Sequence, residues 1–273
     1  MTRNNVCKSS LTALALAATV AFAPASSASL RTYSQDFEDM TPNQGFPPND
    51  LEADGWLIFG IAYETDPNLG PANIAYSYGP FEAANGDPGS IQGVATGEGG
   101  DAQGNVVLNK YTDYNNPDQT VVPFTPGMPK YYISASTFQT QTTSTSNIDD
   151  VWRFAYDAKI GNLEADSSAF AYVQLLDSAG NDKAFVTNDS TNLPDTWGRY
   201  FLDLDLSQYG AVSGDTVNFG FVATSTDYNG SAVFYDNLEF FQAEVEVIPV
   251  PAAVWLFGSG LVGLVGVARR RKH

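Results

Sequence analysis

One stretch of this 273-residue chain combines side chains that suit sugar binding. It spans positions 110–118 and reads KYTDYNNPD, which places the rings of Tyr111 and Tyr114 among the polar groups of Asp113 and Asn115. An aromatic ring can stack on the apolar face of a sugar while amides and carboxylates bind its hydroxyl groups. These four side chains are therefore a candidate ligand site. The alternative is that both tyrosines simply pack at the end of a strand.

The residue types that usually carry catalysis are scarce. The chain has one cysteine, Cys7, and one histidine, His273, both in terminal segments. The body between them therefore offers no thiol nucleophile, no imidazole base and no histidine ligand for zinc. Two of the 31 acidic residues could still hydrolyse a glycoside, but the close pair Asp203 and Asp205 alternates with leucines, which predicts a solvated face. We predict a non-catalytic protein, with a carboxylate-dependent polysaccharide hydrolase as the alternative.

The N-terminal segment has the composition of a signal peptide. Arg3 and Lys8 provide a basic start, positions 11–22 are apolar, and small residues follow. We expect cleavage after Ala28, with cleavage after Ala23 as the alternative. The body of the protein then begins at position 29 and is exported.

The C-terminal segment consists of three parts in a fixed order. A proline pair in Pro249, Val250 and Pro251 precedes an uncharged run at positions 252–268. At about 1.5 Å per residue a helix of this length covers roughly 25 Å, the short end of what spans a bilayer core. Basic residues stay on the cytoplasmic side of a membrane and would keep the body outside. The basic cluster that follows the run is Arg269, Arg270, Arg271 and Lys272.

This tail resembles the PEP-CTERM sorting signal of Gram-negative surface and exopolysaccharide-associated proteins. Val250 replaces the glutamate that names the motif, which leaves the cleavage site open. The resemblance implies that an exosortase-type membrane protease removes the helix from an inner-membrane-anchored precursor. The mature protein would then reach the cell surface or the extracellular matrix, with positions 242–248 as the linker to the tail. A permanent single-span anchor is the alternative.

Charge narrows the range of partners. The two ends, positions 1–28 and 249–273, hold six of the 13 basic residues and none of the 31 acidic ones, which leaves the body and linker together with 7 basic residues and a net charge of −24. Such a surface repels nucleic acid and anionic lipid headgroups. Divalent cations and neutral polysaccharides remain plausible ligands.

Alternating apolar residues predict an all-β body from position 29 to 241. About ten strands separated by Gly, Pro, Asn and Asp indicate an antiparallel two-sheet sandwich, specifically a jelly roll. We expect strands at 33–38, 56–63, 91–96, 106–111, 131–142 and 169–176. The clearest alternations are Trp152, Phe154 and Tyr156; Tyr200, Leu202, Leu204 and Leu206; Val217, Phe219 and Phe221; and Phe234, Asp236, Leu238 and Phe240.

The two ends of this body resemble the galactose-binding-like and carbohydrate-binding-module jelly rolls. The resemblance rests on an early strand ending in Asp36-Phe37-Glu38, on Gly55-Trp56, and on the closing strand at positions 234–238. In that superfamily acidic residues of the first and last strands commonly hold a structural calcium. The resemblance therefore implies calcium on Glu38 and Asp236, with Asp36 as a further ligand. An arginine partner for Asp236 is the alternative.

Together these features predict a non-catalytic exported surface or matrix protein whose sandwich binds carbohydrate. A polysaccharide hydrolase is one alternative. A structural or adhesive surface protein without a soluble ligand is another.

Overall fold

The computed structural model describes residues 29–42, 50–64, 73–78, 93–112, 131–163, 167–225 and 231–243. They all belong to the unit that ends at Ala243, and within them the chain forms strands and one four-residue helix. The elements are β1 (Tyr33–Gln35), α1 (Asp50–Ala53), β2 (Leu57–Glu64), β3 (Asn73–Tyr78), β4 (Gly93–Thr96), β5 (Val106–Thr112), β6 (Tyr131–Thr142), β7 (Val151–Ile160), β8 (Ala169–Leu176), β9 (Asp182–Asp189), β10 (Gly198–Asp205), β11 (Thr216–Ser225) and β12 (Ser231–Gln242).

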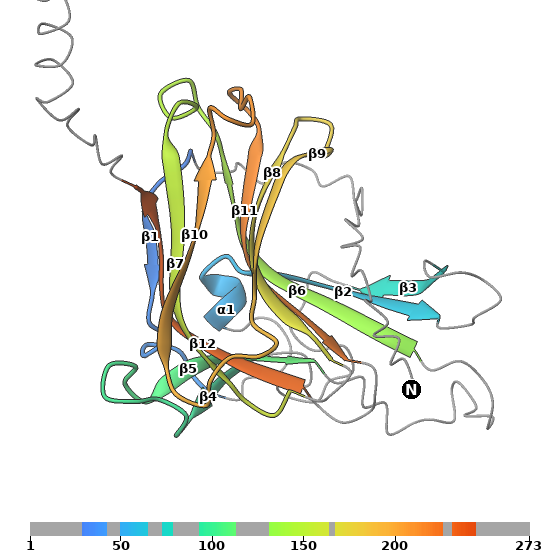
Figure 1. Cartoon of the computed structure of the whole chain (residues 1–273), viewed down its shortest axis with the longest axis vertical. Coiled ribbons are helices and arrows are strands. Elements are labelled where there is room, and N and C mark those ends of the chain that lie inside the picture. Colours follow the sequence, from blue (N-terminus) through green and yellow to red (C-terminus); the bar gives the residue numbers. More distant parts are fainter. Residues whose placement is uncertain are drawn as a thin grey trace, which may run out of the picture. The chain divides into compact units, whose positions relative to one another are not determined.

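The strands form two sheets (Figure 1). Sheet A has six strands in the order β3-β2-β6-β11-β8-β9. Sheet B has the order β10-β7-β12-β5-β4, and β1 pairs with β12 beside β5. Every described strand pair is antiparallel. The antiparallel two-sheet jelly roll predicted from the alternation is confirmed.

Aromatic rings fill the space between the sheets. Phe219 of sheet A stacks on Phe240 of sheet B with ring centroids 4.1 Å apart, and Phe221 stacks on Tyr235 at 3.7 Å. All four side chains are fully buried. Each such pair adds about 0.5–1.5 kcal/mol to the stabilisation that comes from burying its area. Stacked rings therefore hold together a body that has no cysteine for a disulfide.

Three of the predicted alternations point into this core as expected. The inward residues of β7, β10 and β11 are buried or packed against the core, while Arg153 and Asp203 between them face outward and pair with each other. The predicted solvated position of Asp203 is thereby confirmed. A tight polar turn joins β8 and β9, in which Asp177 accepts the backbone N–H groups of Ala179 and Asn181 at 2.8 Å.

The fourth predicted alternation, Phe234, Asp236, Leu238 and Phe240, is wrong between Asp236 and Leu238. The sequence pattern placed Asp236 on one face with Leu238 and Phe240, but a β-bulge lies between Asp236 and Glu239, and Asn237 has a φ of 47°. A bulge adds one residue to a strand and so reverses the faces of everything after it. Leu238 and Phe240 consequently lie in the core, whereas Asp236 lies on the outer face of sheet B.

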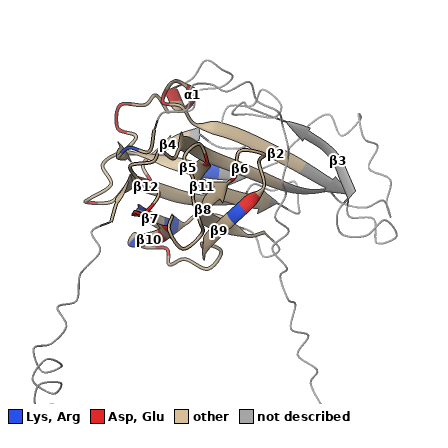
Figure 2. Ribbon diagram, turned by 90° about the horizontal axis from the view of Figure 1, so that it is seen from above, with Lys and Arg blue, Asp and Glu red and all other residues tan. Residues whose placement is uncertain are grey.

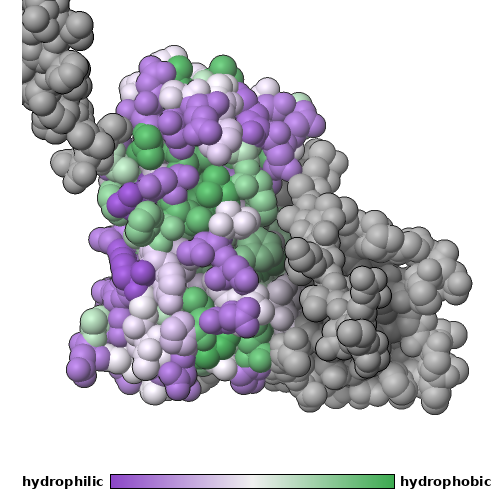
Figure 3. Space-filling model, viewed as in Figure 1, coloured by the Kyte–Doolittle hydropathy of each residue, from purple (hydrophilic) through white to green (hydrophobic). Residues whose placement is uncertain are grey.

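Two strands were not predicted from the sequence. β9 is an edge strand of sheet A in which buried Ala184 is followed by Phe185, whose exposed fraction is 36%. The strand lies near β10 of sheet B but does not pair with it. In the view of Figure 3 hydrophobic side chains gather around β7, β10 and β11. The other unpredicted strand is β3, at the opposite edge of sheet A. Edge strands alternate weakly because only part of each is buried.

One core position is occupied by a lysine. Lys110 of β5 is fully buried, and its Nζ has no hydrogen-bond partner within the described part of the chain. Burial disfavours the charged form and lowers the pKa of this amine to about 7. Lys110 is therefore not available at the surface, where a serine nucleophile would need a lysine as its base.

Several predictions concern residues outside those described. They are the signal peptide at 1–28, the linker at 244–248, and the sorting tail with Pro249, Val250, Pro251, Arg269, Arg270 and Arg271. Among the residues that are described, none forms a helix of the length and apolarity needed to cross a membrane.

Candidate functional site

The bulge in β12 coincides with a change of neighbouring strand. Positions 231–235 of β12 pair with β5 and positions 238–240 pair with β1, so Asp236 and Asn237 lie between the two ladders. Phe37, just after β1, has a φ of 59° and so shares the left-handed backbone of Asn237. Non-glycine residues in this region cost on the order of 1–3 kcal/mol each and cluster at functional sites. This junction is therefore the first candidate site.

Asp236 is the buried centre of the junction. Its side chain is 0% exposed, and neither carboxylate oxygen has a hydrogen-bond partner among the described residues. Burial raises its pKa to about 7; the nearby backbone N–H of Asn237 opposes the rise, and the negative charges of the surrounding carboxylates, Asp157, Asp36 and Glu38, add to it. An unpaired carboxylate in such a place is costly. Within the described part of the chain Asp236 forms no ion pair, so the predicted alternative of an arginine partner is not supported there.

Glu38 and Asp36 come from the turn that follows β1. One oxygen of Glu38 accepts the backbone N–H groups of Asn105 and Val106, each at 2.7 Å, which fixes the turn against the start of β5. A carboxylate oxygen of Asp36 accepts the backbone N–H of Glu38 at 3.3 Å. The structure thus brings the three predicted metal residues, Glu38, Asp36 and Asp236, to the same junction.

Asp157 is a fourth acidic residue at this site that sequence reasoning missed. It pairs directly with Asp236 across β7 and β12, so both side chains leave the same face of sheet B. Its carboxylate accepts side-chain N–H groups from Gln103 and Asn237, each at 2.8 Å, and contacts Arg199 at 3.2 Å. The alternation of β7 predicted an outward Asp157, but nothing in the sequence gave its register against β12.

These residues fit a hard cation in kind, but they do not form a closed cage. Among the described residues no three acidic, histidine or cysteine side chains converge as metal ligands. Asp236 offers two unpartnered oxygens, and one oxygen of Glu38 is already used by two N–H donors. A calcium ion here would be bound by Asp236 together with carbonyl oxygens or water, which calcium accepts readily.

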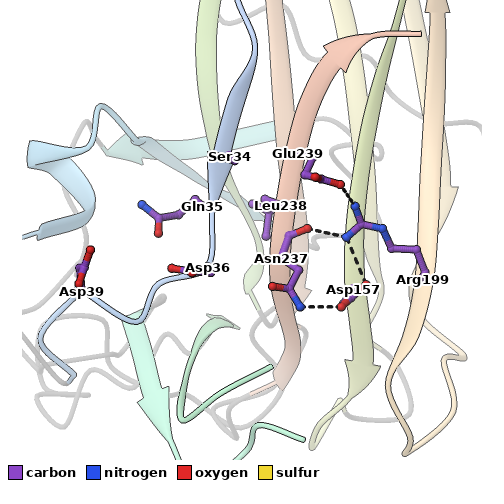
Figure 4. Close-up of a pocket in the computed structure, with 9 residues that line it drawn as sticks. All are labelled: Ser34, Gln35, Asp36, Asp39, Asp157, Arg199, Asn237, Leu238 and Glu239. Carbon is purple, nitrogen blue, oxygen red and sulfur yellow. Dashed lines mark hydrogen bonds and ion pairs between the residues drawn. The ribbon is translucent and has the colours of Figure 1, made fainter. Parts of the chain in front are cut away.

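A surface pocket of about 630 Å³ adjoins the junction. Figure 4 shows Arg199 reaching from β10 to Asp157, to the carbonyl oxygen of Asn237 and to Glu239. The pocket therefore combines one arginine with an excess of carboxylates. Its lining residues are Ser34, Gln35, Asp36, Asp39, Asp157, Arg199, Asn237, Leu238 and Glu239.

A second candidate site lies on the opposite, outer face of sheet A. Five aromatic rings cross β2, β6, β8 and β9 on that face, with neighbouring centroids 5.5 to 6.5 Å apart. The outer face of a two-layer sandwich is normally polar, so a continuous aromatic row there is unusual. We call these residues the aromatic row: Phe59, Phe138, Phe170, Tyr172 and Phe185.

Gly220 of β11 makes the centre of the row possible. It pairs with Phe138 on one side and with Tyr172 on the other, and those two rings approach to 6.4 Å across it. A Cβ at this position would lie 2.1 Å from the carbonyl oxygen of Thr137 and 2.8 Å from the Cβ of Phe138. Any side chain at Gly220 would therefore displace β6 and interrupt the row.

The ligand residues predicted from the sequence cannot be placed in either site. Tyr111 lies near the end of β5, but its side chain is outside the described residues, as are Asp113, Tyr114 and Asn115. The aromatic row was missed although β6 and β8 were predicted correctly. The signal was present, because Phe138, Phe170 and Tyr172 occupy positions that alternate with the inward-facing residues of those strands.

No family model matches the chain, and no curated protein matches it either. Solved structures with a related sandwich include the xylan-binding CBM22-1 domain of Paenibacillus barcinonensis Xyn10C. The identity is 11%, the match covers 80% of this chain and 98% of that domain, and the TM-score is 0.39.

Two further neighbours are another carbohydrate-binding module and a cyclase. The family 22 carbohydrate-binding module of Clostridium thermocellum Xyn10B is 14% identical over 82% of this chain and all of its own length, with a TM-score of 0.35. A Stig cyclase from Fischerella sp. TAU is 14% identical over 79% of this chain and 100% of its own, with a TM-score of 0.43. The carbohydrate-binding-module jelly rolls are thus among the neighbours, and identities this low concern the fold only.

The state of Asp236 can be measured through stability. Because its folded pKa of about 7 lies above the ordinary value of 3.8, the folded protein binds a proton between these values that the unfolded chain does not. Stability without metal should therefore fall as pH rises from about 4 to 7. In chelator at pH 8, Asp236→Asn should melt at least about 2 °C higher than the parent, and the difference should vanish near pH 4. A variant that melts lower than the parent at pH 8 would show that the carboxylate has a favourable partner.

Proposed function

We propose that this chain is a non-catalytic exported protein of the cell surface or extracellular matrix, and that its sandwich binds carbohydrate through the aromatic row. The observation that carries the proposal is the row itself. Its rings occupy a sheet face that does not contribute to the core between the sheets. Tyr172 at the centre is only 4% exposed and supports its neighbours, whereas Phe185 is 36% exposed. The accessible rings present flat apolar surfaces, which match the C–H faces of pyranose rings.

Polar side chains accompany the row. Gln174 and Asn218 lie on the same face of β8 and β11, and the amide of Asn218 donates to Gln174 at 3.1 Å. Gln174 also donates to Asp182 at 2.5 Å, so both of its amide groups are already engaged. The capacity left for sugar hydroxyl groups beside the rings lies on Asn218 and Asp182, and such polar groups give sugar sites orientation and specificity. The five rings are uncharged, so the row itself would suit a neutral polysaccharide, and the carboxylates of Asp182 and Asp189 at its β9 edge would accept hydrogen bonds from hydroxyl groups.

The residues support binding more than hydrolysis. A general acid for glycoside cleavage needs a raised pKa and contact with the glycosidic oxygen. Asp236 has the raised pKa, but its side chain is 0% exposed and lies on the other sheet. The body also lacks histidine and cysteine.

We further propose a structural calcium at the Asp236 junction. The unpartnered, buried carboxylate supports this, and Glu38 and Asp36 lie at the same junction. The ion would offset the cost of burying Asp236 and would fasten the turn after β1 to β12. Its role would be stability, not chemistry on a substrate.

The carbohydrate proposal is tested with Phe185→Ala, which removes the ring at the edge of the row. Affinity electrophoresis of the full-length protein in soluble xylan, mixed-linkage β-glucan and amylose should show retention by at least one of them. Losing one stacking ring should raise the Kd for that glycan about fivefold, and Phe185→Tyr should restore binding. Val212→Ala is the matched control, because Val212 is 55% exposed and lies outside the row.

The outcomes separate the alternatives. Release of reducing sugar from the retained polysaccharide would identify a hydrolase instead. Absence of retention on every glycan would leave a structural or adhesive protein. If Phe185→Ala binds like the parent while Tyr111→Ala with Tyr114→Ala does not, the site lies at positions 111–115 as the sequence pattern suggested.

The calcium proposal is tested by melting the full-length protein in calcium and in chelator. A ligand that binds only the folded state stabilises it by about 2.7 kcal/mol at a hundredfold excess over Kd. Calcium should raise the Tm of the parent, and Asp236→Asn should remove most of that rise. Magnesium should substitute poorly because it requires tighter octahedral geometry. Identical melting curves for the parent in both buffers would rule out the ion.

Sorting is proposed from the tail motif, with an exosortase-type protease as the partner and the membrane as the transient anchor. Mass spectrometry of the mature surface or secreted protein should then find no peptide that contains Trp255 or Arg270. Intact C-terminal peptides in that fraction would indicate a permanent anchor. Replacing the basic cluster Arg269 to Lys272 by neutral residues should impair membrane orientation, because the positive-inside bias is lost.

A further inference from the structure

The outer face of sheet B carries an exposed aromatic ring beside the acidic pocket. Phe201 of β10, Ala155 of β7, Glu239 of β12 and Ser34 of β1 are cross-strand partners and so form one row across the sheet. The small side chain of Ala155 leaves a shallow floor between Phe201 and Glu239. Glu239 and Ser34 also line the 630 Å³ pocket, whereas Phe201 and Ala155 do not, so the ring lies in the same cross-strand row as one edge of the pocket.

Phe201 is held in place but remains accessible. Its side chain is 54% exposed, and the guanidinium of Arg153 lies 4.2 Å from the ring centroid. Arg153 is in turn fixed by two hydrogen bonds to Asp203, at 2.7 and 2.8 Å. A ring stiffened in this way loses little freedom when a ligand stacks on it.

The pocket beside this ring is strongly negative. Four carboxylates line it, and the single lining cation, Arg199, already contacts two of them, Asp157 and Glu239. Asp236, the buried cross-strand partner of Asp157, does not line the pocket and belongs to the proposed calcium junction. Asp39 does line the pocket and forms no ion pair with a described residue. The pocket therefore has unused capacity for hydrogen-bond donors and positive charge.

The rest of the described protein offers little positive charge to an acidic ligand. Of its six basic residues, four form ion pairs with carboxylates and Lys110 is buried. Figure 2 shows the paired cations on β7, β9 and β10. The net charge of −24 on the body and linker also draws cations toward the surface from a distance.

We propose that this face, formed by Phe201, Ala155 and the acidic pocket, is a second saccharide site selective for sugars that carry a protonated amine. The apolar face of the sugar stacks on Phe201, and the ammonium group lies among the carboxylates of the pocket. An N-acetylated sugar loses the charge, and a uronic acid meets repulsion. The site is separate from the aromatic row, which lies on the other sheet.

The test uses the full-length protein in calcium-containing buffer at about pH 6, titrated with a hexamer of β-1,4-linked glucosamine. The fully N-acetylated hexamer and oligogalacturonate serve as comparison ligands. The glucosamine hexamer should bind at least about tenfold more tightly than either, and its affinity should fall with added salt. Phe201→Ala should raise its Kd about fivefold, as expected for one stacking ring. Glu239→Gln should raise it about threefold, as expected for an exposed ion pair.

Val212→Ala should change nothing in these titrations. Both site variants should keep the parent's retention on the neutral polysaccharide, which separates this site from the aromatic row. Equal binding of the free and N-acetylated hexamers would overturn the amine selectivity. Unchanged affinity in Phe201→Ala, confirmed as folded by its melting curve, would overturn the location. If the parent protein binds the glucosamine hexamer but does not bind the neutral polysaccharide, the proposed function of the aromatic row fails and this site stands.

Discussion

Most of this structure depends on how β12 satisfies its backbone hydrogen bonds. The strand is twelve residues long and pairs along most of its length with β7, but on its other side it needs two partners in succession, β5 and then β1. The bulge at Asp236 and Asn237 allows this change, because it shifts the register and turns the second half of the strand over. The same shift sends Leu238 and Phe240 into the core. It also leaves the buried carboxylate of Asp236 on the outer face of the sheet, where its cross-strand partner is another acid, Asp157.

The core illustrates how a body of this size holds together without covalent links. Facing rings stack or meet edge to face across the gap between the sheets, as Tyr156 does with Phe221. Rings of neighbouring strands also meet edge to face, as Tyr156 does with Tyr235. Both outer faces also carry aromatic side chains. On sheet A they contact one another over Gly220, and on sheet B Phe201 and Phe234 each lie near a cation. The two faces therefore offer different chemistry, a row of contacting rings on sheet A and an acidic pocket on sheet B.

Sequence reasoning predicted the architecture well because a long alternation of apolar and polar residues fits a strand with one face in the core and little else. Tyr131–Thr142 and Ala169–Leu176 were predicted with the observed bounds, and the inward residues of β7, β10 and β11 were correct. It failed at Asp236, because a bulge is a local backbone event with no signature in a two-residue period. Asn237, which tolerates positive φ, was the available hint.

The candidate sites were only partly predictable. Asp236, Glu38 and Asp36 do lie at one junction, although the described acidic side chains do not converge as metal ligands. Asp157, Arg199 and the aromatic row depend on strand order and register, which link residues far apart in the chain.

The place of β12 in the sheet also determines how the fold bears force. The chain continues beyond Ala243 directly from this strand, which has neighbours on both sides. A pull on the C-terminal end therefore enters the sandwich through an interior strand and not through an edge that could peel away one bond at a time. The ladders to β7 and β1 share the load at that end, and the backbone of Ala243 adds a further bond to Val151 at 2.8 Å. A body attached by this end would resist extension by shearing whole ladders, which suits a protein held at a surface under flow.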